Sequence, residues 1–204
     1  MSFAATLATA TTLMVRQSTE LAELFGFETR NKYAIETATG KPVAFAAEQQ
    51  KGVLGFLLRQ LLGHFRTFEI QFFDAARAPV LRAVHPFRLL FQRLEVFDAG
   101  GRMLGAIQQR FALFSKRFDV QNAAGRVTLE VRSPLWRPWT FVFTRDGREV
   151  ARIEKKWSGV LTEVFTDKDR FFVQLGTETT TDERQLLLAA AIFIDLQYFE
   201  NKAD

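Results

Sequence analysis

The sequence predicts a mainly β protein, a twelve-stranded antiparallel β-barrel that encloses a C-terminal hydrophobic α-helix. One observation behind this prediction is the run 186–194 (LLLAAAIFI), which is apolar on every side and therefore belongs to a buried helix. The other is a repeated hairpin pattern whose turn centres, near residues 77, 100, 124 and 147, are 23 or 24 residues apart. A sheet of that many strands tends to close into a barrel with room inside for the helix.

The first residues are expected to stand apart from this barrel. We predict an N-terminal segment at 1–24, partly flexible or helical, and one domain at 25–204. The first 15 residues carry no charge and lack the basic region of a signal peptide. A chain of 204 residues with 48% hydrophobic content is long enough for one well-buried core. The absence of cysteine excludes disulfides and thiolate metal sites, and it suits a reducing compartment.

The strands are predicted from apolar residues that alternate on both sides of short turns, most of which contain glycine. Five hairpins supply ten strands, and two more strands are expected at 160–165 and 170–175. The predicted hairpins are 32–47, 68–84, 94–107, 118–131 and 141–153.

The helix is predicted to begin at a capping box, in which Thr180 caps the first turn and Glu183 reaches back. It should continue for about 20 residues, to the polar pair Glu200 and Asn201. A membrane span needs about 20 mostly apolar residues, whereas this run meets Asp195 after nine. We therefore expect protein, not lipid, around the helix.

An up-and-down barrel has two different ends. The short polar turns should all lie at one end, the turn end. The longer connections 51–66, 82–93, 109–117 and 132–139 should lie at the other, the connection end. These connections hold 45 residues, with 11 Lys or Arg and no Asp or Glu. A basic, apolar end without acids fits a surface that meets an anionic membrane interface.

Apolar and basic residues of the connections are therefore the candidate membrane- or lipid-binding residues. Two alternatives stay open: these side chains could fold inward and close the barrel, and residues 111–117 suit either arrangement. Leu, Val and Phe outnumber Tyr and Trp, which favours acyl chains over stacked nucleic-acid bases. The candidates are Val53, Leu54, Phe56, Leu57, Leu58, Arg59, Leu61, Leu62, Phe87, Arg88, Leu89, Leu90, Phe91, Trp136, Arg137 and Trp139.

Several short motifs, in order along most of the chain, resemble those of the phospholipid scramblase family. The resemblance implies the Tubby-like, LURP-one-related fold, a barrel around a C-terminal hydrophobic helix, in agreement with the strand pattern. It implies phospholipid binding at a membrane surface, with transbilayer phospholipid movement as a further activity. The motifs are 25–29 (FGFET), 31–33 (NKY), 45–48 (FAAE), 156–159 (KWSG), 163–167 (EVFTD), 193–195 (FID) and 198–200 (YFE).

The chain departs from the family in its connections. Animal scramblases carry cysteine clusters, which can be acylated, in the stretches that correspond to 51–64, 87–92 and 133–139. This chain has Leu, Phe, Trp and Arg there. We expect direct insertion of apolar side chains to replace lipid anchors at this end of the barrel.

The family's proposed calcium loop falls on residues 167–178, where only Asp167, Asp169 and Glu178 offer side-chain oxygens at the required positions. Lys168 and Arg170 oppose a cation. A polar hairpin turn at the turn end is the simpler interpretation, and calcium binding is the alternative. No other cofactor is expected.

No motif supports covalent catalysis. Ser158 lacks the nucleophile-elbow pattern, and no phosphate-binding glycine loop occurs. His64 and His85 lack neighbouring carboxylates and are interpreted as surface or interfacial residues. Asp195 is expected to have a structural partner, because a bare buried carboxylate is very costly.

The sequence therefore predicts a phospholipid-binding protein that is peripheral at the cytoplasmic face of the plasma membrane. The alternative is a soluble Tubby-like module that binds lipid or regulates a partner without moving lipid. A nucleic-acid partner rests on the net charge of +4 alone.

Overall fold

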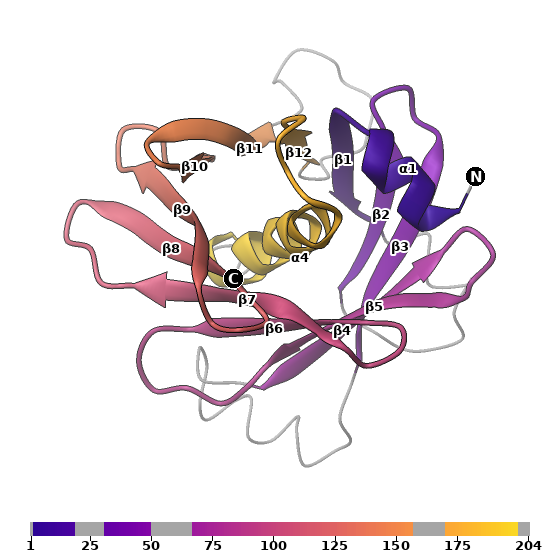
Figure 1. Cartoon of the computed structure of the whole chain (residues 1–204), viewed down its shortest axis with the longest axis horizontal. Coiled ribbons are helices and arrows are strands. Elements are labelled where there is room, and N and C mark those ends of the chain that lie inside the picture. Colours follow the sequence, from indigo (N-terminus) through magenta and orange to yellow (C-terminus); the bar gives the residue numbers. More distant parts are fainter. Residues whose placement is uncertain (1, 19–30, 50–66, 157–169, 200–204) are drawn as a thin grey trace, which may run out of the picture.

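Twelve antiparallel strands form a closed barrel in the part of the chain that the computed structural model describes, residues 2–18, 31–49, 67–156 and 170–199. Figure 1 shows the strands surrounding helix α4, Thr181–Tyr198. The predicted fold class, a mainly β barrel around a C-terminal helix, is confirmed. The strands are β1 (Thr12–Gln17), β2 (Lys32–Thr37), β3 (Pro42–Gln49), β4 (Phe68–Asp74), β5 (Pro79–His85), β6 (Arg93–Asp98), β7 (Met103–Arg110), β8 (Ser115–Asn122), β9 (Val127–Pro134), β10 (Thr140–Arg145), β11 (Arg148–Lys156) and β12 (Arg170–Leu175).

The strand that closes the barrel is β1, which comes from the segment 1–24 that the sequence analysis treated separately. Each strand from β2 to β12 pairs with the next, and β1 joins the two ends of that series. In register, Val15 of β1 faces Ile35 on one side and Phe171 on the other. The predicted strand 160–165 lies outside the described residues. In the described sheet, β11 pairs directly with β12.

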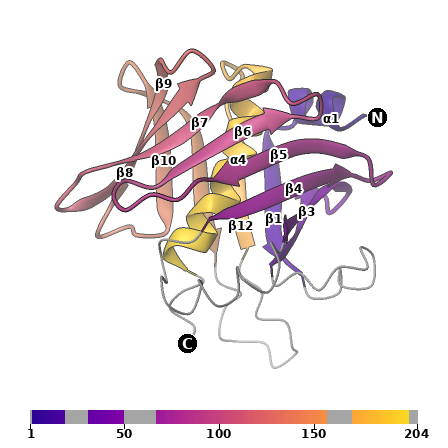
Figure 2. The ribbon, with the colours of Figure 1, turned by 90° about the horizontal axis from the view of Figure 1, so that it is seen from below.

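Helix α4 is enclosed along most of its length. Every residue from 186 to 196 is at most 4% exposed, so the apolar run has no solvent-facing side. Alternate residues of the strands point inward and pack against it, which explains why so many of the 22 phenylalanines lie in the core. Figure 2 shows α4 passing through the barrel from one end to the other.

The N-terminus of α4 is fixed at the turn end. Thr180 and Glu183 form the predicted capping box, and Arg145 of β10 pairs with the Glu183 carboxylate. The buried Arg184 donates hydrogen bonds of 2.8 Å each to the carbonyl oxygens of Leu7 and Ala10. These carbonyls lie in and just after α1, Phe3–Thr9, so Arg184 holds this short helix against α4.

The turns and connections segregate as predicted. Hairpin turns at Gly40, Arg77, Gly101, Gly125 and Gly147 share the end where α4 begins, since their strands run side by side in register. The C-terminal turn of α4 lies at the opposite end, with the connections between hairpins. This separation leaves the connection end as the candidate functional surface.

Gly105 of β7 is required by a close backbone approach. A Cβ built there would lie 2.0 Å from the Gln121 carbonyl oxygen and 3.1 Å from Leu186 of α4. We predict that Gly105→Ala lowers the free energy of unfolding by about 3 kcal/mol, because overpacking displaces both β8 and the helix. The control is Gly100→Ala, whose Cβ would meet only Asp98, at 3.4 Å. Equal denaturant midpoints for the two variants would contradict this account.

Acid should weaken the start of α4. Burial raises the pKa of Glu183, but hydrogen bonds from the Thr180 backbone and Arg145 outweigh it and hold the pKa below its ordinary value of 4.5. The carboxylate therefore stabilises the fold above pH 4.5, and this contribution disappears as the pH falls through the lowered pKa. Glu183→Gln should lower the melting temperature near neutral pH and reduce its decline below pH 4.5. If the melting temperatures of the wild type and the variant fell equally with pH in this range, the account would be contradicted.

Candidate functional site

The β5–β6 connection, residues 86–92, turns its apolar side chains toward solvent. Gln92 anchors it: its backbone N–H donates to the Gln109 side chain, and Gln108 donates to the Phe91 carbonyl at 3.0 Å. Polar contacts thus fix the backbone while the apolar side chains face outward. The exposed fractions are 50% for Phe87, 65% for Leu89, 74% for Leu90 and 45% for Phe91.

The β9–β10 connection, residues 135–139, has the same character. Two backbone hydrogen bonds, from Arg137 N to Pro134 O and from Thr140 N to Arg137 O, fold it into consecutive turns. The buried Ser133 hydroxyl also donates to the Arg137 carbonyl. Trp136 is left 80% exposed, and Trp139 43%.

The β7–β8 connection was open to two interpretations in the sequence, and its side chains turn outward. Phe111, Leu113 and Phe114 are 69%, 73% and 76% exposed. Arg110 and Arg117 lie opposite each other as the last pair of the β7–β8 ladder, and the connection joins the two strands beyond this pair. These residues were absent from the predicted site because a loop has no period from which the direction of a side chain can be inferred.

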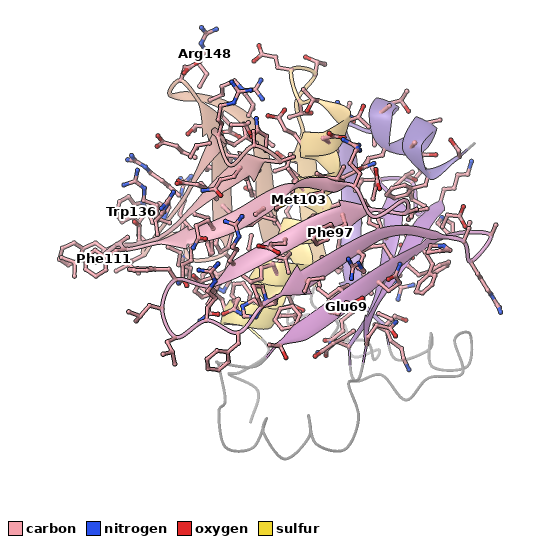
Figure 3. All side chains as sticks on the ribbon, turned by 60° about the horizontal axis from the view of Figure 1, so that its bottom comes forward. Glu69, Phe97, Met103, Phe111, Trp136 and Arg148 are labelled. Atoms are coloured by element: carbon pink, nitrogen blue, oxygen red, sulfur yellow. The ribbon has the colours of Figure 1, made fainter. Side chains whose placement is uncertain are left out.

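The three connections lie at the same end of the barrel, and we call their exposed apolar side chains the apolar rim. A soluble monomer that exposes many large apolar side chains at one end commonly uses them for binding. No Asp or Glu occurs in 86–92, 111–114 or 135–139. Figure 3 shows Phe111 and Trp136 at the same margin of the barrel, away from Arg148 at the turn end. The rim consists of Phe87, Leu89, Leu90, Phe91, Phe111, Leu113, Phe114, Leu135, Trp136 and Trp139.

Of the candidate lipid-binding residues, the eight between Val53 and Leu62 lie outside the described residues. The other eight occupy the β5–β6 and β9–β10 connections, where Arg88 and Arg137 are exposed beside the rim. The structure thus brings half of the predicted set together. It adds Phe111, Leu113, Phe114 and Leu135, which the sequence analysis left out.

The calcium candidates are not brought together in the part of the chain that is described. Asp167 and Asp169 lie outside it, and Glu178 is exposed at the turn end, where its carbonyl accepts from Arg145. In the β11–β12 ladder, Lys156 lies opposite Arg170, so both residues that border 157–169 lie at the connection end. The sequence analysis placed the turn between these strands at the turn end, and the position of the two bordering residues contradicts that placement. Among the described residues, no group of three His, Asp or Glu side chains could hold a metal ion.

A buried polar cluster lies beneath the connection end. The Tyr33 hydroxyl donates to Asp195 of α4 at 2.9 Å, and Asn31 donates to Glu48 at 2.7 Å. Gln17 extends the chain by donating to Asn31. Asp195 therefore has the structural partner expected for a buried carboxylate. Several residues that carry the family resemblance meet here, although they are far apart in the sequence.

His85 corrects a sequence interpretation. It is fully buried, stacks on Phe68 at 4.5 Å between ring centroids, and lies 5.8 Å from Phe193 of α4. It is therefore a core residue at the connection end rather than a surface or interfacial one. The strand parity shared with Leu81 and Ala83, both fully buried, is the signal that identifies it.

Two lysines pack on the last turn of α4. The Lys116 ammonium lies 4.2 Å from the Tyr198 ring centroid, and the Lys155 ammonium lies 4.0 Å from that of Phe199. Cations near a helix C-terminus also interact favourably with its dipole. Burial raises the pKa of Tyr198 to about 12, so its hydroxyl stays protonated and accepts a hydrogen bond from Gln109.

The fold and the rim define a class: a helix-filled antiparallel barrel with an apolar, acid-free surface at one end. The chain belongs to the scramblase family, because the family model described as Scramblase matches residues 2–201. This confirms the resemblance seen in the motifs. Within the described residues, no helix is both long and apolar enough to span a membrane.

Similar proteins bear related names. The chain is 28% identical to phospholipid scramblase 2 of Bos taurus, covering 92% of this chain and 68% of the relative. It is 30% identical to phospholipid scramblase 1 of Mus musculus, covering 92% and 61%. It is 24% identical to altered inheritance rate of mitochondria protein 25 of Saccharomyces cerevisiae, covering 92% and 70%. No solved structure matches, so the wider Tubby-like kinship stays a prediction.

The Tyr33–Asp195 hydrogen bond should matter for stability. Because Asp195 is 4% exposed, removing the hydroxyl deprives a buried carboxylate of a donor. We predict that Tyr33→Phe lowers the free energy of unfolding by about 2 kcal/mol, whereas Tyr198→Phe, which loses a bond between neutral groups, costs about 1 kcal/mol. Urea denaturation of the two variants measures the difference. A Tyr33→Phe variant as stable as the wild type would refute the assignment.

Proposed function

We propose that this protein binds phospholipid at a membrane surface through the connection end and aids the movement of phospholipid between leaflets. The observation that carries the proposal is the apolar rim, exposed and without acids, in a chain of the scramblase family. The relatives' names refer to phospholipid scrambling. Membership of that family supports carrying the activity over to this chain.

The chemistry of the rim favours a lipid interface. Exposed Phe and Leu gain free energy when they leave water for acyl chains, and Trp is typical of the boundary between headgroups and hydrocarbon. Arg88 and Arg137 stand among these side chains, where each cation near an anionic surface contributes about 1 kcal/mol. The cytoplasmic leaflet is the anionic one, so we propose peripheral association with the cytoplasmic face of the plasma membrane.

Vesicle flotation tests the binding step. The protein should float with vesicles of phosphatidylcholine mixed with phosphatidylserine. The double variant Leu113→Ser, Phe114→Ser should bind about a hundredfold more weakly, because inserting two such side chains contributes about 3 kcal/mol. Val127→Ser is the matched control, since Val127 is 48% exposed at the turn-end start of β9. A folded wild type that floats with neither neutral nor anionic vesicles would overturn the proposal.

Proteoliposomes test the movement step. Dithionite quenches fluorescently labelled lipid in the outer leaflet only, so a scrambling protein exposes the inner-leaflet label as well. We expect quenching of both leaflets at low protein-to-vesicle ratios. Binding without such quenching would instead support a lipid-binding or regulatory module that does not move lipid.

A further inference from the structure

Three arginines stand in register across neighbouring strands just behind the apolar rim. Arg110 of β7 lies directly opposite Arg117 of β8, and Arg117 lies opposite Arg132 of β9. Their strand neighbours Phe118 and Val131 are 1% exposed in the core, so alternation turns the arginines to the outside of the barrel. We call Arg110, Arg117 and Arg132 the arginine row.

The arginine row is unfavourable for the folded protein alone. Like charges directly opposite each other on antiparallel strands are destabilising. Arg110 pairs with Asp119, but Arg117 and Arg132 share one oxygen of Glu130, 3.7 Å from each, beyond hydrogen-bonding distance. The side chains of Arg117 and Arg132 are 39% and 65% exposed, so donors of their guanidinium groups remain for an external acceptor.

The position of the row fits one kind of acceptor. Arg117 is three residues from Phe114, and Arg132 three from Leu135, so the row lies at most about 10 Å behind the tips of the rim. The headgroup layer of a bilayer is about 5 to 8 Å thick on each side, and interfacial elements bury about 5 to 10 Å. When the tips reach the acyl chains, the guanidinium groups stand at the level of the phosphates.

We propose that the arginine row is a binding site for the phosphates of anionic phospholipids, a role that rests on the membrane binding proposed above. Guanidinium groups bind phosphate in a two-pronged geometry and are more weakly hydrated than ammonium groups. A bound phosphate also relieves the repulsion within the row. The row then sets how deeply the rim inserts and selects membranes of negative charge.

The test compares two variants that lose the same charge. Arg117→Gln with Arg132→Gln removes two members of the row, whereas Arg126→Gln with Arg148→Gln removes two exposed arginines near the turn end. Binding is measured by flotation with vesicles of phosphatidylcholine alone and mixed with phosphatidylserine. The row variant should bind the mixed vesicles about thirtyfold more weakly than the wild type, equivalent to about 2 kcal/mol for two cations. The control variant should bind like the wild type.

The outcomes separate this inference from the proposed function. If both variants lose the same affinity, only net charge matters and the row is overturned as a site, while membrane binding stands. If the row variant binds like the wild type, the row is overturned as well. If the wild type binds no vesicle, the proposed function itself fails. Cooperative thermal melting of both variants checks that each is folded.

Discussion

The enclosure of an apolar helix is the constraint on which the rest of the structure depends. Helix α4 has no polar face along 186–194, so each side must be covered, and here a closed sheet covers it from all directions. A helix is about 10 to 12 Å wide with its side chains, which requires a barrel of many strands. The first backbone N–H groups of the helix still need partners, and the capping box supplies them, while two lysines pack on the aromatic rings of its last turn.

Filling the barrel with α4 also decides where function can lie. The inward side chains of the strands pack on the helix, and residues such as Phe72, Phe141 and Phe193 are essentially fully buried. The interior of the described barrel is therefore occupied by the protein itself. Chemistry that faces a partner must use the outside or the ends. Of the two ends, the turn end carries polar hairpins and α1, whereas the connection end carries the apolar rim.

The sequence was most informative in strands and helices, where the side chains point in directions that repeat at a fixed residue spacing. Alternation and glycine-containing turns located the five hairpins, and the capping box located the start of α4, because these signals are local. The strand β1 was missed because Thr12–Gln17 has no hairpin partner next to it in the sequence and pairs with β2 and β12 across long separations. His85 was misjudged by residue type, although its strand parity placed it inside. The rim at Phe111 to Phe114 could not be assigned, since only the register of Arg110 with Arg117 shows where the ladder ends and the loop turns outward.

Charge distinguishes a membrane from a second copy of the chain as the occupant of the rim. An apolar surface alone would favour either, because both remove it from water. Two copies that met rim to rim would bring Arg88 and Arg137 of each close together, and no carboxylate in 86–92, 111–114 or 135–139 would offset them. The two arginine rows would also approach, each with three arginines but only Asp119 and Glu130 as ion-pair partners. An anionic bilayer supplies hydrocarbon for the apolar side chains and phosphates for the cations at the depth where each is needed. The arrangement of apolar tips ahead of a row of arginines is thus complementary to a lipid surface and self-repelling toward its own copy.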